Sequence, residues 1–579
     1  MDAELFYVVV GAVLVAAVAR WRGWPAPLLV TTVALAVSFL PFVPDLQIDG
    51  HLLLNIVLPP LLYSASLDVS FVSFQRSLPQ IRRLGVGLVV VTTVAVGLVA
   101  WWLMPSLTLP GALLLGAIVA PPDAVSAAAI GRRLGLPRRV MTVLSGESLI
   151  NDATSLTLYR VFAAIVAGAA SFNIWGTLGQ FALAVIVGVA IGVVAGTGLH
   201  LLRMKISDPV VNGTFGLLAP FGIYAITEHL GGSGVLGVVA MGLVVGYNAP
   251  RTSYATRQQE TPIWLSADFL LESFVFAYIG LQFPRVLADL GAGHAGGVIG
   301  LSAAVLLVVL VVRPLFVYPA SAWGQMWQRM RLRRWERAVA SGRMQQRMRR
   351  VEEKHAKRGR TGRVPTTDEV KQSRIVEPQL SWKDNAVVSW AGMRGVVTLA
   401  TALAASDLAG LEASASHAIV VAAFVVTVGT LLLQGLTLPF LIRGLGIGND
   451  AEAAEDAAQL AQVRARTRDA GKKYLAGKRE EWEQRHGDEA LERFDRFAQR
   501  ITRVERDTDR AQAEEEKVPR PSREELVDLS KGWLRVRRDV LIQERDAGAL
   551  NEEVMRELIV AMDAEELALD TRMEMRGDR

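Results

Sequence analysis

Residues 110–131 read PGALLLGAIVAPPDAVSAAAIG, an apolar run long enough to cross a membrane, and Pro121, Pro122 and Asp123 interrupt it at its centre. Proline has no backbone N–H, so two in succession break the helical hydrogen-bond ladder and leave carbonyl groups unsatisfied. Opened backbone at membrane depth is tolerated only where it is buried in protein or lines a cavity, and many transporters build cation sites from it. The stretch therefore predicts a broken membrane helix with Asp123 at the break.

A second interruption, AGMRG at 391–395, falls inside the apolar segment 384–406. Two broken helices, one in each half of the chain, are typical of inverted-repeat transporters. For the first break taken alone, the alternative is a proline kink whose polar residue faces another helix.

Charged residues are distributed unevenly along the 579-residue chain, which has 61 Lys and Arg and 56 Asp and Glu. Residues 1–322 hold only 30 of them, and the mean hydropathy is +0.32 despite the polar C-terminal part. These values exclude a string of soluble domains and predict a polytopic membrane protein with a soluble tail. The absence of cysteine excludes disulfides, iron–sulfur clusters and thiolate zinc sites.

Thirteen apolar segments are predicted to span the membrane, and the first follows an acidic start rather than the basic start of a cleavable signal. Alternate loops up to residue 257 hold thirteen Lys and Arg residues, whereas the intervening loops hold one, Arg285. This asymmetry predicts an N-terminus outside and a C-terminal tail in the cytoplasm. The segments are 5–20, 25–42, 51–68, 84–104, 110–131, 139–168, 176–202, 209–230, 232–248, 262–284, 294–322, 384–406 and 415–442.

The loop 323–383 between spans 11 and 12 is strongly basic, with 17 Lys and Arg against 6 Asp and Glu. Its apolar residues recur at helical spacing among arginines, which predicts a helix on an anionic membrane surface; they are Trp323, Met326, Trp327 and Met330. A solvated basic linker is the alternative, and nucleic-acid binding is not expected of a segment tethered between two spans. We assign 1–443 to a transmembrane domain and 444–579 to a helical cytosolic domain, in which Ser522 is a predicted N-cap.

Ionisable side chains at membrane depth are costly, so each one is a candidate for function. Those predicted near span ends, Asp208, Arg313 and Asp384, are explained by solvation or by side chains that reach the interface. The others are Asp123, Glu147, Asp152, Arg160, Asp268, Glu272 and Arg394.

Four polar side chains cluster in the sixth predicted span. Glu147, Asn151 and Asp152 lie on roughly one half of the helix, with Ser148 between them. Oxygen ligands of this kind suit a hard cation such as Na⁺. Two nearby carboxylates repel each other, so one of them is expected to have a cationic partner, and Arg394 beside the second break is the candidate.

Several stretches together resemble the monovalent cation:proton antiporter-1 family, which includes bacterial NhaP-type Na⁺/H⁺ antiporters and eukaryotic sodium/proton exchangers. The resemblance covers about residues 5–443 in order and spacing. The stretches are GESLINDATSLTLY (146–159), APPDAV (120–125), AGMRGVVTLATAL (391–403), ESFVFAYIG (272–280) and QG (434–435).

The resemblance implies an all-α, NhaA-like antiporter fold with about 13 transmembrane helices in two inverted repeats with broken crossing helices. It also implies a homodimer in the plasma membrane that exchanges Na⁺ or Li⁺ for H⁺ electroneutrally, for pH and sodium homeostasis. No cofactor is expected.

By the same resemblance, Asp152 carries the ion or proton, Asn151 is its structural partner and Arg394 pairs with Glu147. Many members have threonine where this chain has Pro122, which retains the carbonyl but lacks the hydroxyl, and this difference bears on ion preference. The expected cation-binding groups are Asp152, Asp123, Ser148, Glu147 and the main-chain carbonyl of Pro122.

The remaining residues have two interpretations each. Asp268 and Glu272 share one face of the tenth span. They either line a cytoplasmic funnel or have a structural role, with hydrogen-bond partners in neighbouring helices. Arg160 is expected in a structural ion pair or to extend toward the interface. The small-residue ridge of the seventh span is expected to permit close helix packing; its members are Gly188, Gly192 and Gly196.

These observations predict a transporter in which one carboxylate site, Asp152 with Asp123, binds a cation or a proton but not both. Exchange of K⁺ for H⁺ is the alternative within this class. A cation channel gated by the tail is a second alternative, although the chain has no TVGYG-like filter. An enzyme is not expected, because H-E-x-x-H and G-x-S-x-G motifs are absent from the sequence.

Overall fold

The computed structural model describes residues 2–40, 50, 53–169, 174–206, 208–284, 288, 295–342, 346, 379–406, 408–448, 450–486, 491–504 and 523–577. The regular elements among them are all helices, as predicted. The chain forms two compact units, Met1–Arg333 with Val376–Asn449, and Arg334–Ile375 with Asp450–Arg579. The predicted loop charge Arg285, most of 343–378 and the predicted N-cap Ser522 lie outside the described residues.

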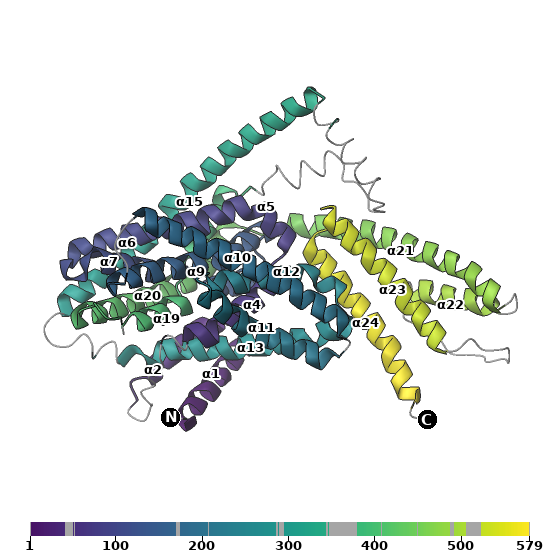
Figure 1. Cartoon of the computed structure of the whole chain (residues 1–579), viewed down its shortest axis with the longest axis horizontal. Coiled ribbons are helices and arrows are strands. Elements are labelled where there is room, and N and C mark those ends of the chain that lie inside the picture. Colours follow the sequence, from purple (N-terminus) through teal and green to yellow (C-terminus); the bar gives the residue numbers. More distant parts are fainter. Residues whose placement is uncertain are drawn as a thin grey trace. The chain divides into compact units, whose positions relative to one another are not determined.

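The first unit begins with helices that lead to the first break (Figure 1). They are α1 (Asp2–Arg22), α2 (Ala26–Val37), η1 (Leu53–Val57), α4 (Leu58–Asp68), α5 (Phe71–Arg82), η2 (Arg83–Leu88), α6 (Val89–Leu103), η3 (Pro105–Leu107), α7 (Thr108–Val119), α8 (Ala124–Arg133) and α9 (Arg138–Val166).

The same unit continues through the second break. Its further elements are α10 (Ile174–Lys205), α11 (Pro209–His229), α12 (Gly234–Asn248), η4 (Ala249–Arg251), α13 (Tyr254–Leu281), α15 (Ala295–Ala340) as far as Arg333, α18 (Trp382–Trp390), α19 (Val396–Ser406) and α20 (Ala413–Leu445). Both predicted breaks are confirmed, because α7 ends before Pro121 and α18 ends before Gly392.

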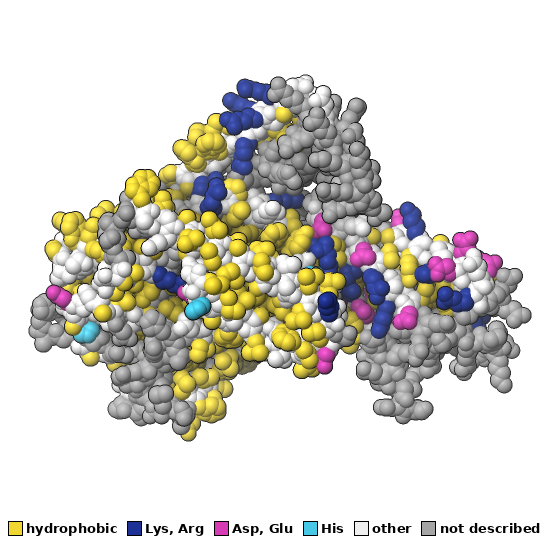
Figure 2. Space-filling model, viewed as in Figure 1, with side chains coloured by type: hydrophobic (Ala, Val, Ile, Leu, Met, Phe, Trp, Pro, Cys, Tyr) yellow, Lys and Arg dark blue, Asp and Glu magenta, His cyan; other side chains and the backbone are white. Residues whose placement is uncertain are grey.

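Nine helices of the described residues are long and apolar enough to cross a membrane. Shorter apolar helices occupy Ala26–Val37, Leu53–Asp68, Pro105–Val119 and Val396–Ser406. Apolar side chains cover most of the visible surface of these helices (Figure 2), as a hydrocarbon environment requires. The count of thirteen spans stays a prediction.

Helices α10 and α12 pack closely because glycine lines their contact. A Cβ atom placed on Gly192 would lie 2.2 Å from the carbonyl oxygen of Gly237, and one placed on Gly196 would lie 2.9 Å from that of Met241. Any side chain there would push the two helices apart. The predicted close packing of this ridge is therefore confirmed.

Asp384 differs from its expected solvated position at a span end. Its carboxylate accepts a hydrogen bond from the backbone N–H of Ser381, and its own N–H donates to Ser381 Oγ, which forms a capping box at the start of α18. It also forms an ion pair of 2.9 Å with Arg139, and it is 1% exposed. The sequence indicates that α18 begins near Asp384, but it does not show that the start of α9, with Arg139, packs against it. Asp208, by contrast, caps α11 at an exposed position.

The predicted interfacial segment begins as a direct continuation of a span. Helix α15 runs without interruption from Ala295 to Ala340, and it carries the exposed side chains of Trp323, Met326 and Trp327. A separate surface helix is therefore not formed at the start of the 323–383 loop. Membrane-surface binding by these residues stays a prediction.

The second unit has four helices, α21 (Asp450–His486), α22 (Leu491–Val504), α23 (Arg523–Asp546) and α24 (Glu552–Gly577). Their apolar faces meet in one core that includes Trp533, Phe494 and Leu541. Charged pairs such as Arg538 with Asp563 hold α23 to α24. This part of the tail is helical, as predicted.

Candidate functional site

The two helix breaks lie against each other and share a main-chain hydrogen bond. The N–H of Asp123 in the first break donates to the carbonyl oxygen of Met393 in the second, at 2.5 Å. Gly395 permits this approach, because a Cβ atom there would lie 2.7 Å from that of Asp123. Two segments separated by about 270 residues are therefore joined at one point.

Side chains of α9 satisfy carbonyl groups that the first break exposes. The carbonyl of Ala117 would accept from residue 121 in a continuous helix, but Pro121 has no N–H. Ser155 Oγ donates to this carbonyl instead, at 2.8 Å. Asn151 Nδ2 donates to the carbonyl of Pro122 at 3.1 Å. Asn151 thus holds the backbone of the break and leaves its neighbour Asp152 available for chemistry.

Arg394 satisfies the carbonyl groups at the C-terminal end of α7. Its Nε donates to the carbonyl of Val119 at 3.0 Å, and its Nη2 donates to that of Ala120 at 3.3 Å. Its Nη1 donates to the carbonyl of Gly392. A buried cation at this point also compensates the partial negative charge of a helix C-terminus.

The expected ion pair between Arg394 and Glu147 is therefore wrong, because Glu147 binds Arg313. The two carboxylate oxygens of Glu147 accept from Arg313 Nη1 at 2.6 Å and Nη2 at 2.9 Å. Arg313 Nε donates to the carbonyl of Val388 in the last turn of α18, at 2.9 Å. Both charged side chains are only 2% exposed.

The prediction that Arg313 lies near a span end is also wrong. The apolar pattern ends at about residue 322, but α15 continues to Ala340, so Arg313 lies in the interior of the helix. In the sequence, Arg313 is a charged residue within an apolar segment, which is the same pattern that identifies Asp152. A planar guanidinium that binds a carboxylate through two parallel hydrogen bonds is a strong and directional contact.

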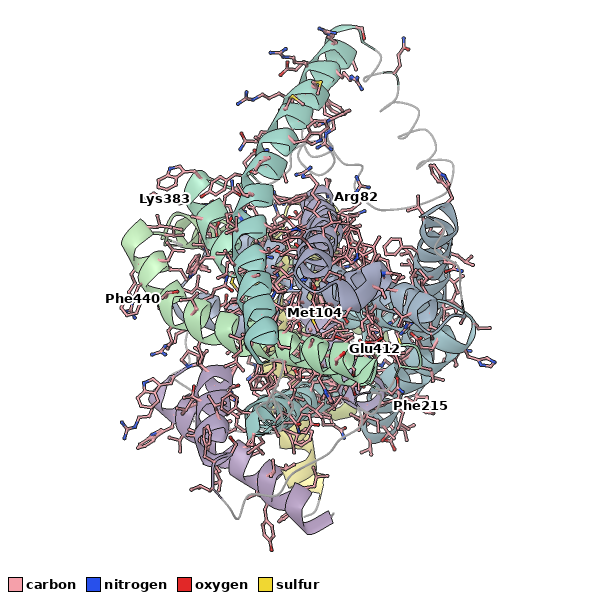
Figure 3. All side chains as sticks on the ribbon, turned by 90° about the vertical axis from the view of Figure 1, so that its left-hand side faces the viewer. Arg82, Met104, Phe215, Lys383, Glu412 and Phe440 are labelled. Atoms are coloured by element: carbon pink, nitrogen blue, oxygen red, sulfur yellow. The ribbon has the colours of Figure 1, made fainter. Side chains whose placement is uncertain are left out.

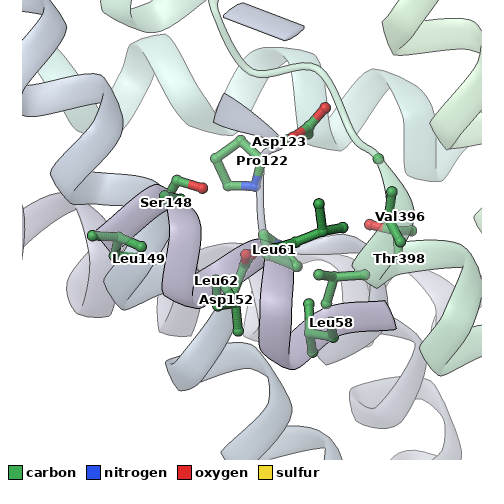
Figure 4. Close-up of a pocket in the computed structure, with 14 residues that line it drawn as sticks. Leu58, Leu61, Leu62, Pro122, Asp123, Ser148, Leu149, Asp152, Val396 and Thr398 are labelled. Atoms are coloured by element: carbon green, nitrogen blue, oxygen red, sulfur yellow. The ribbon is translucent and has the colours of Figure 1, made fainter. Parts of the chain in front are cut away.

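A cavity of about 70 Å³ lies where α9 meets the two breaks (Figure 4). Asp123, Ser148 and Asp152 line it together, and Asp152 is 8% exposed. Their role as cation ligands stays a prediction. Glu147 does not belong to its lining. The other lining residues are Leu58, Leu61, Leu62, Ala65, Pro121, Pro122, Leu149, Gly395, Val396, Val397 and Thr398.

The electrostatics of this cavity favour a cation or a proton. Asp123 and Asp152 are close enough to interact electrostatically, and most of the other lining side chains, from α4, α9, α19 and the breaks, are apolar. A cation or a proton between two such carboxylates relieves their repulsion. No cluster of three or more His, Cys, Asp or Glu capable of holding a metal ion occurs within the described part of the chain.

Residues 8–444 match the model of a protein family described as sodium/hydrogen exchanger, transmembrane. The chain belongs to this family. It is therefore a multi-pass membrane protein of the sodium/hydrogen exchanger family, as the sequence motifs predicted.

Known members of the exchanger family are similar along most of the chain. The chain is 32% identical to an uncharacterized Na⁺/H⁺ exchanger of Mycobacterium tuberculosis, over 80% of this chain and 79% of that protein. It is 29% identical to a Na⁺/H⁺ antiporter of Aphanothece halophytica, over 74% of this chain and 71% of that protein. The fold resembles the sodium proton antiporter of Methanocaldococcus jannaschii, with a TM-score of 0.53, 17% identity and coverage of 77% and 98%.

Other ionisable residues of this exchanger-family member lie outside the cavity lining. Asp268 accepts a hydrogen bond from Ser64 Oγ of α4, and Glu272 lies one turn further along α13. Arg160 forms an ion pair of 2.5 Å with Glu228. Arg160 therefore forms a structural ion pair, as predicted. A funnel role for Asp268 and Glu272 stays a prediction.

Proposed function

We propose that the protein exchanges Na⁺ for H⁺ across the plasma membrane through the cavity between α9 and the two helix breaks. One observation carries this proposal: Asp152 and Asp123 face one small, mostly apolar cavity beside unwound backbone. Oxygen ligands at such a point suit a hard monovalent cation. Membership of the exchanger family and the Na⁺/H⁺ exchange named for its relatives support the same activity.

The proposed mechanism is competition at Asp152. Ionised Asp152 and Asp123 bind the cation together with Ser148 and backbone oxygen, and a proton on Asp152 excludes it. Glu147 serves as a positioning residue, because Arg313 occupies both of its oxygens. Movement of the loaded site between the two membrane faces completes each half of an electroneutral, one-for-one cycle.

We propose that the N-terminus lies outside the cell and the C-terminal tail in the cytoplasm. Arg82 and Lys383 lie toward one end of the helices in Figure 3, and Met104 and Glu412 lie toward the other. Basic residues are retained on the cytoplasmic side. We further propose that residues 1–443 form the antiporter domain of a homodimer and that 444–579 form a cytosolic domain.

The experiment is ion exchange in proteoliposomes that contain a pH-sensitive dye. Wild-type protein should move protons only when an opposed Na⁺, Li⁺ or K⁺ gradient is applied. The exchange rates with the three cations give its ion preference. Asp152→Asn should fold, because a neutral amide is less costly to bury than a charge, and should show no cation-driven flux at any pH. Asp208→Asn, at an exposed helix cap, should exchange normally.

Proton flux in the wild type without a cation gradient would favour a channel and contradict the proposal. Retained exchange in Asp152→Asn would remove this residue from the centre of the mechanism.

Competition also predicts a pH dependence with a definite sign. Below the apparent pKa of the site, each bound proton must leave before a cation enters. The half-saturating Na⁺ concentration should therefore rise about tenfold for each unit by which the pH falls in that range, and should level off at higher pH. Initial exchange rates measured against Na⁺ concentration at several pH values test this. An affinity that does not change across acidic pH would contradict competition.

A further inference from the structure

Thr398 carries a buried hydroxyl group that the proposed mechanism does not use. It lies on α19 and lines the same cavity as Asp152 and Asp123. Its side-chain oxygen is fully buried and has no hydrogen-bond partner within the described residues. A buried hydroxyl without a partner costs stability, so this position requires an explanation.

The helix break explains why the hydroxyl is unsatisfied. A threonine inside a helix normally donates to the carbonyl four residues earlier. Thr401, one turn further along α19, does so to Val397 at 2.6 Å, and Thr430 of α20 does so to Val426 at 2.7 Å. For Thr398 the corresponding residue is Arg394, which lies in the break before α19 begins. The usual acceptor is therefore out of helical position.

The residues around Thr398 contribute few other side-chain oxygen atoms to the cavity. Of the residues that line the cavity, four have oxygen in their side chains, namely Asp123, Ser148, Asp152 and Thr398. Figure 4 shows Thr398 and Ser148 on opposite sides of the pocket. The walls contributed by α4 and by the rest of α19 are apolar.

We infer that the hydroxyl oxygen of Thr398 is a direct ligand of the transported cation. It supplies a neutral oxygen from α19, opposite the ligands of α9, so that the cation is enclosed from both sides. Small hard cations bind by surrounding themselves with oxygen ligands, and the unsatisfied hydroxyl is available at no cost in lost protein contacts. Thr398 thereby sets ion affinity and preference. This inference rests on the proposed exchange at the cavity.

Thr398→Val tests the inference, because valine keeps the shape of threonine and removes only the hydroxyl. The half-saturating Na⁺ concentration should rise about tenfold in proteoliposomes, and its ratio to the value for K⁺ should change. Thr398→Ser should remain near wild type. Thr401→Val, on the same helix but bonded to its own backbone, should leave both values unchanged.

Thermal unfolding separates a ligand role from a structural role. Without Na⁺ or Li⁺, Thr398→Val should unfold at the wild-type temperature or above it, because the lost hydroxyl had no partner. Added Na⁺ should raise the unfolding temperature of the wild type more than that of Thr398→Val. A lower unfolding temperature in the absence of cation would reveal a structural partner and overturn the inference.

The two proposals fail in different ways. If the wild type shows no cation-driven proton flux and no stabilisation by Na⁺, the proposed function fails. If the wild type exchanges but Thr398→Val has wild-type affinity and the wild-type ratio of Na⁺ to K⁺, the proposed function stands and the ligand role of Thr398 is wrong.

Discussion

Arg313 and Glu147 show how a buried charge is made tolerable beside an ion site. Desolvation of two charges is costly, and the pair persists because each carboxylate oxygen and each guanidinium nitrogen has a hydrogen-bond partner. Both Glu147 oxygens accept from Arg313, whose third donor reaches the carbonyl of Val388. The pair thus joins α9, α15 and the end of α18. A third ionised carboxylate is in this way kept out of the cation cavity.

Removal of either partner should destabilise the protein strongly. Glu147→Gln or Arg313→Gln alone leaves an unpaired buried charge, which typically costs about 3–5 kcal/mol. The double variant should recover part of that loss. Thermal unfolding of the wild type, both single variants and the double variant measures the coupling.

The control is Arg160 with Glu228, whose side chains are 35% and 27% exposed. The same set of substitutions there should change stability by about 1 kcal/mol or less. Strictly additive effects for Glu147 and Arg313 would show that the pair is not coupled.

Three polar residues of the cavity could be predicted from the sequence, but Thr398 and the partner of Glu147 could not. Asp152, Asp123 and Ser148 stand out because a polar residue in an apolar segment, or beside two prolines, is conspicuous in any window of the sequence. The partner of Glu147 depends on which distant helix approaches α9. Arg394 and Arg313 carry the same local signal, and only the packing of α15 against α18 distinguishes them.

At the scale of elements, the two helix breaks can be recognised in the sequence from Pro121 and Gly392. The hydrogen bonds between the two breaks cannot be recognised from the sequence. Each break supplies what the other lacks: Arg394 donates to the last carbonyls of α7, and Asp123 donates to Met393. The end of α15 also differs from its predicted position. Apolar composition shows which residues lie in the membrane, but a helix can continue beyond them.

The contact between α10 and α12 should be sensitive to a single methyl group. Gly192→Ala would bring a Cβ atom to 2.2 Å from the Gly237 carbonyl, and the helices must separate, which costs about 1–3 kcal/mol. Gly198→Ala is the matched control on the same helix, because nothing lies within 4 Å of its Cβ position. Alanine there should be neutral or stabilising by up to about 1 kcal/mol. Equal unfolding temperatures for the two variants would contradict the close contact.

At the scale of the whole molecule, the first unit should fold and transport without the second. Truncation after Gly448 removes α21 to α24 and keeps every residue of the cavity. It also keeps the end of α20, where Lys383 Nζ donates to the carbonyl of Leu445 at 2.7 Å. The truncated protein should exchange Na⁺ for H⁺, with a shifted pH response or a weaker dimer.

The control is truncation after Leu433, which removes the buried residues Leu438 and Ile442 of α20 and should prevent folding. Flux assays and size-exclusion chromatography distinguish the two proteins. A folded protein truncated after Gly448 that shows no exchange at any pH would make the tail part of the transport machinery.

The hydrogen bond from Ser155 to the Ala117 carbonyl has a consequence for how such a protein changes over evolutionary time. Ser155 is needed because position 121 is proline and offers no N–H. Loss of Ser155 while Pro121 remains strands a carbonyl in the interior of the membrane protein. If a residue with an N–H were to replace Pro121 first, the later loss of Ser155 would be tolerated. A change from the broken to the continuous helix is therefore tolerated if Pro121 is replaced before Ser155 is lost, and it is not tolerated in the opposite order.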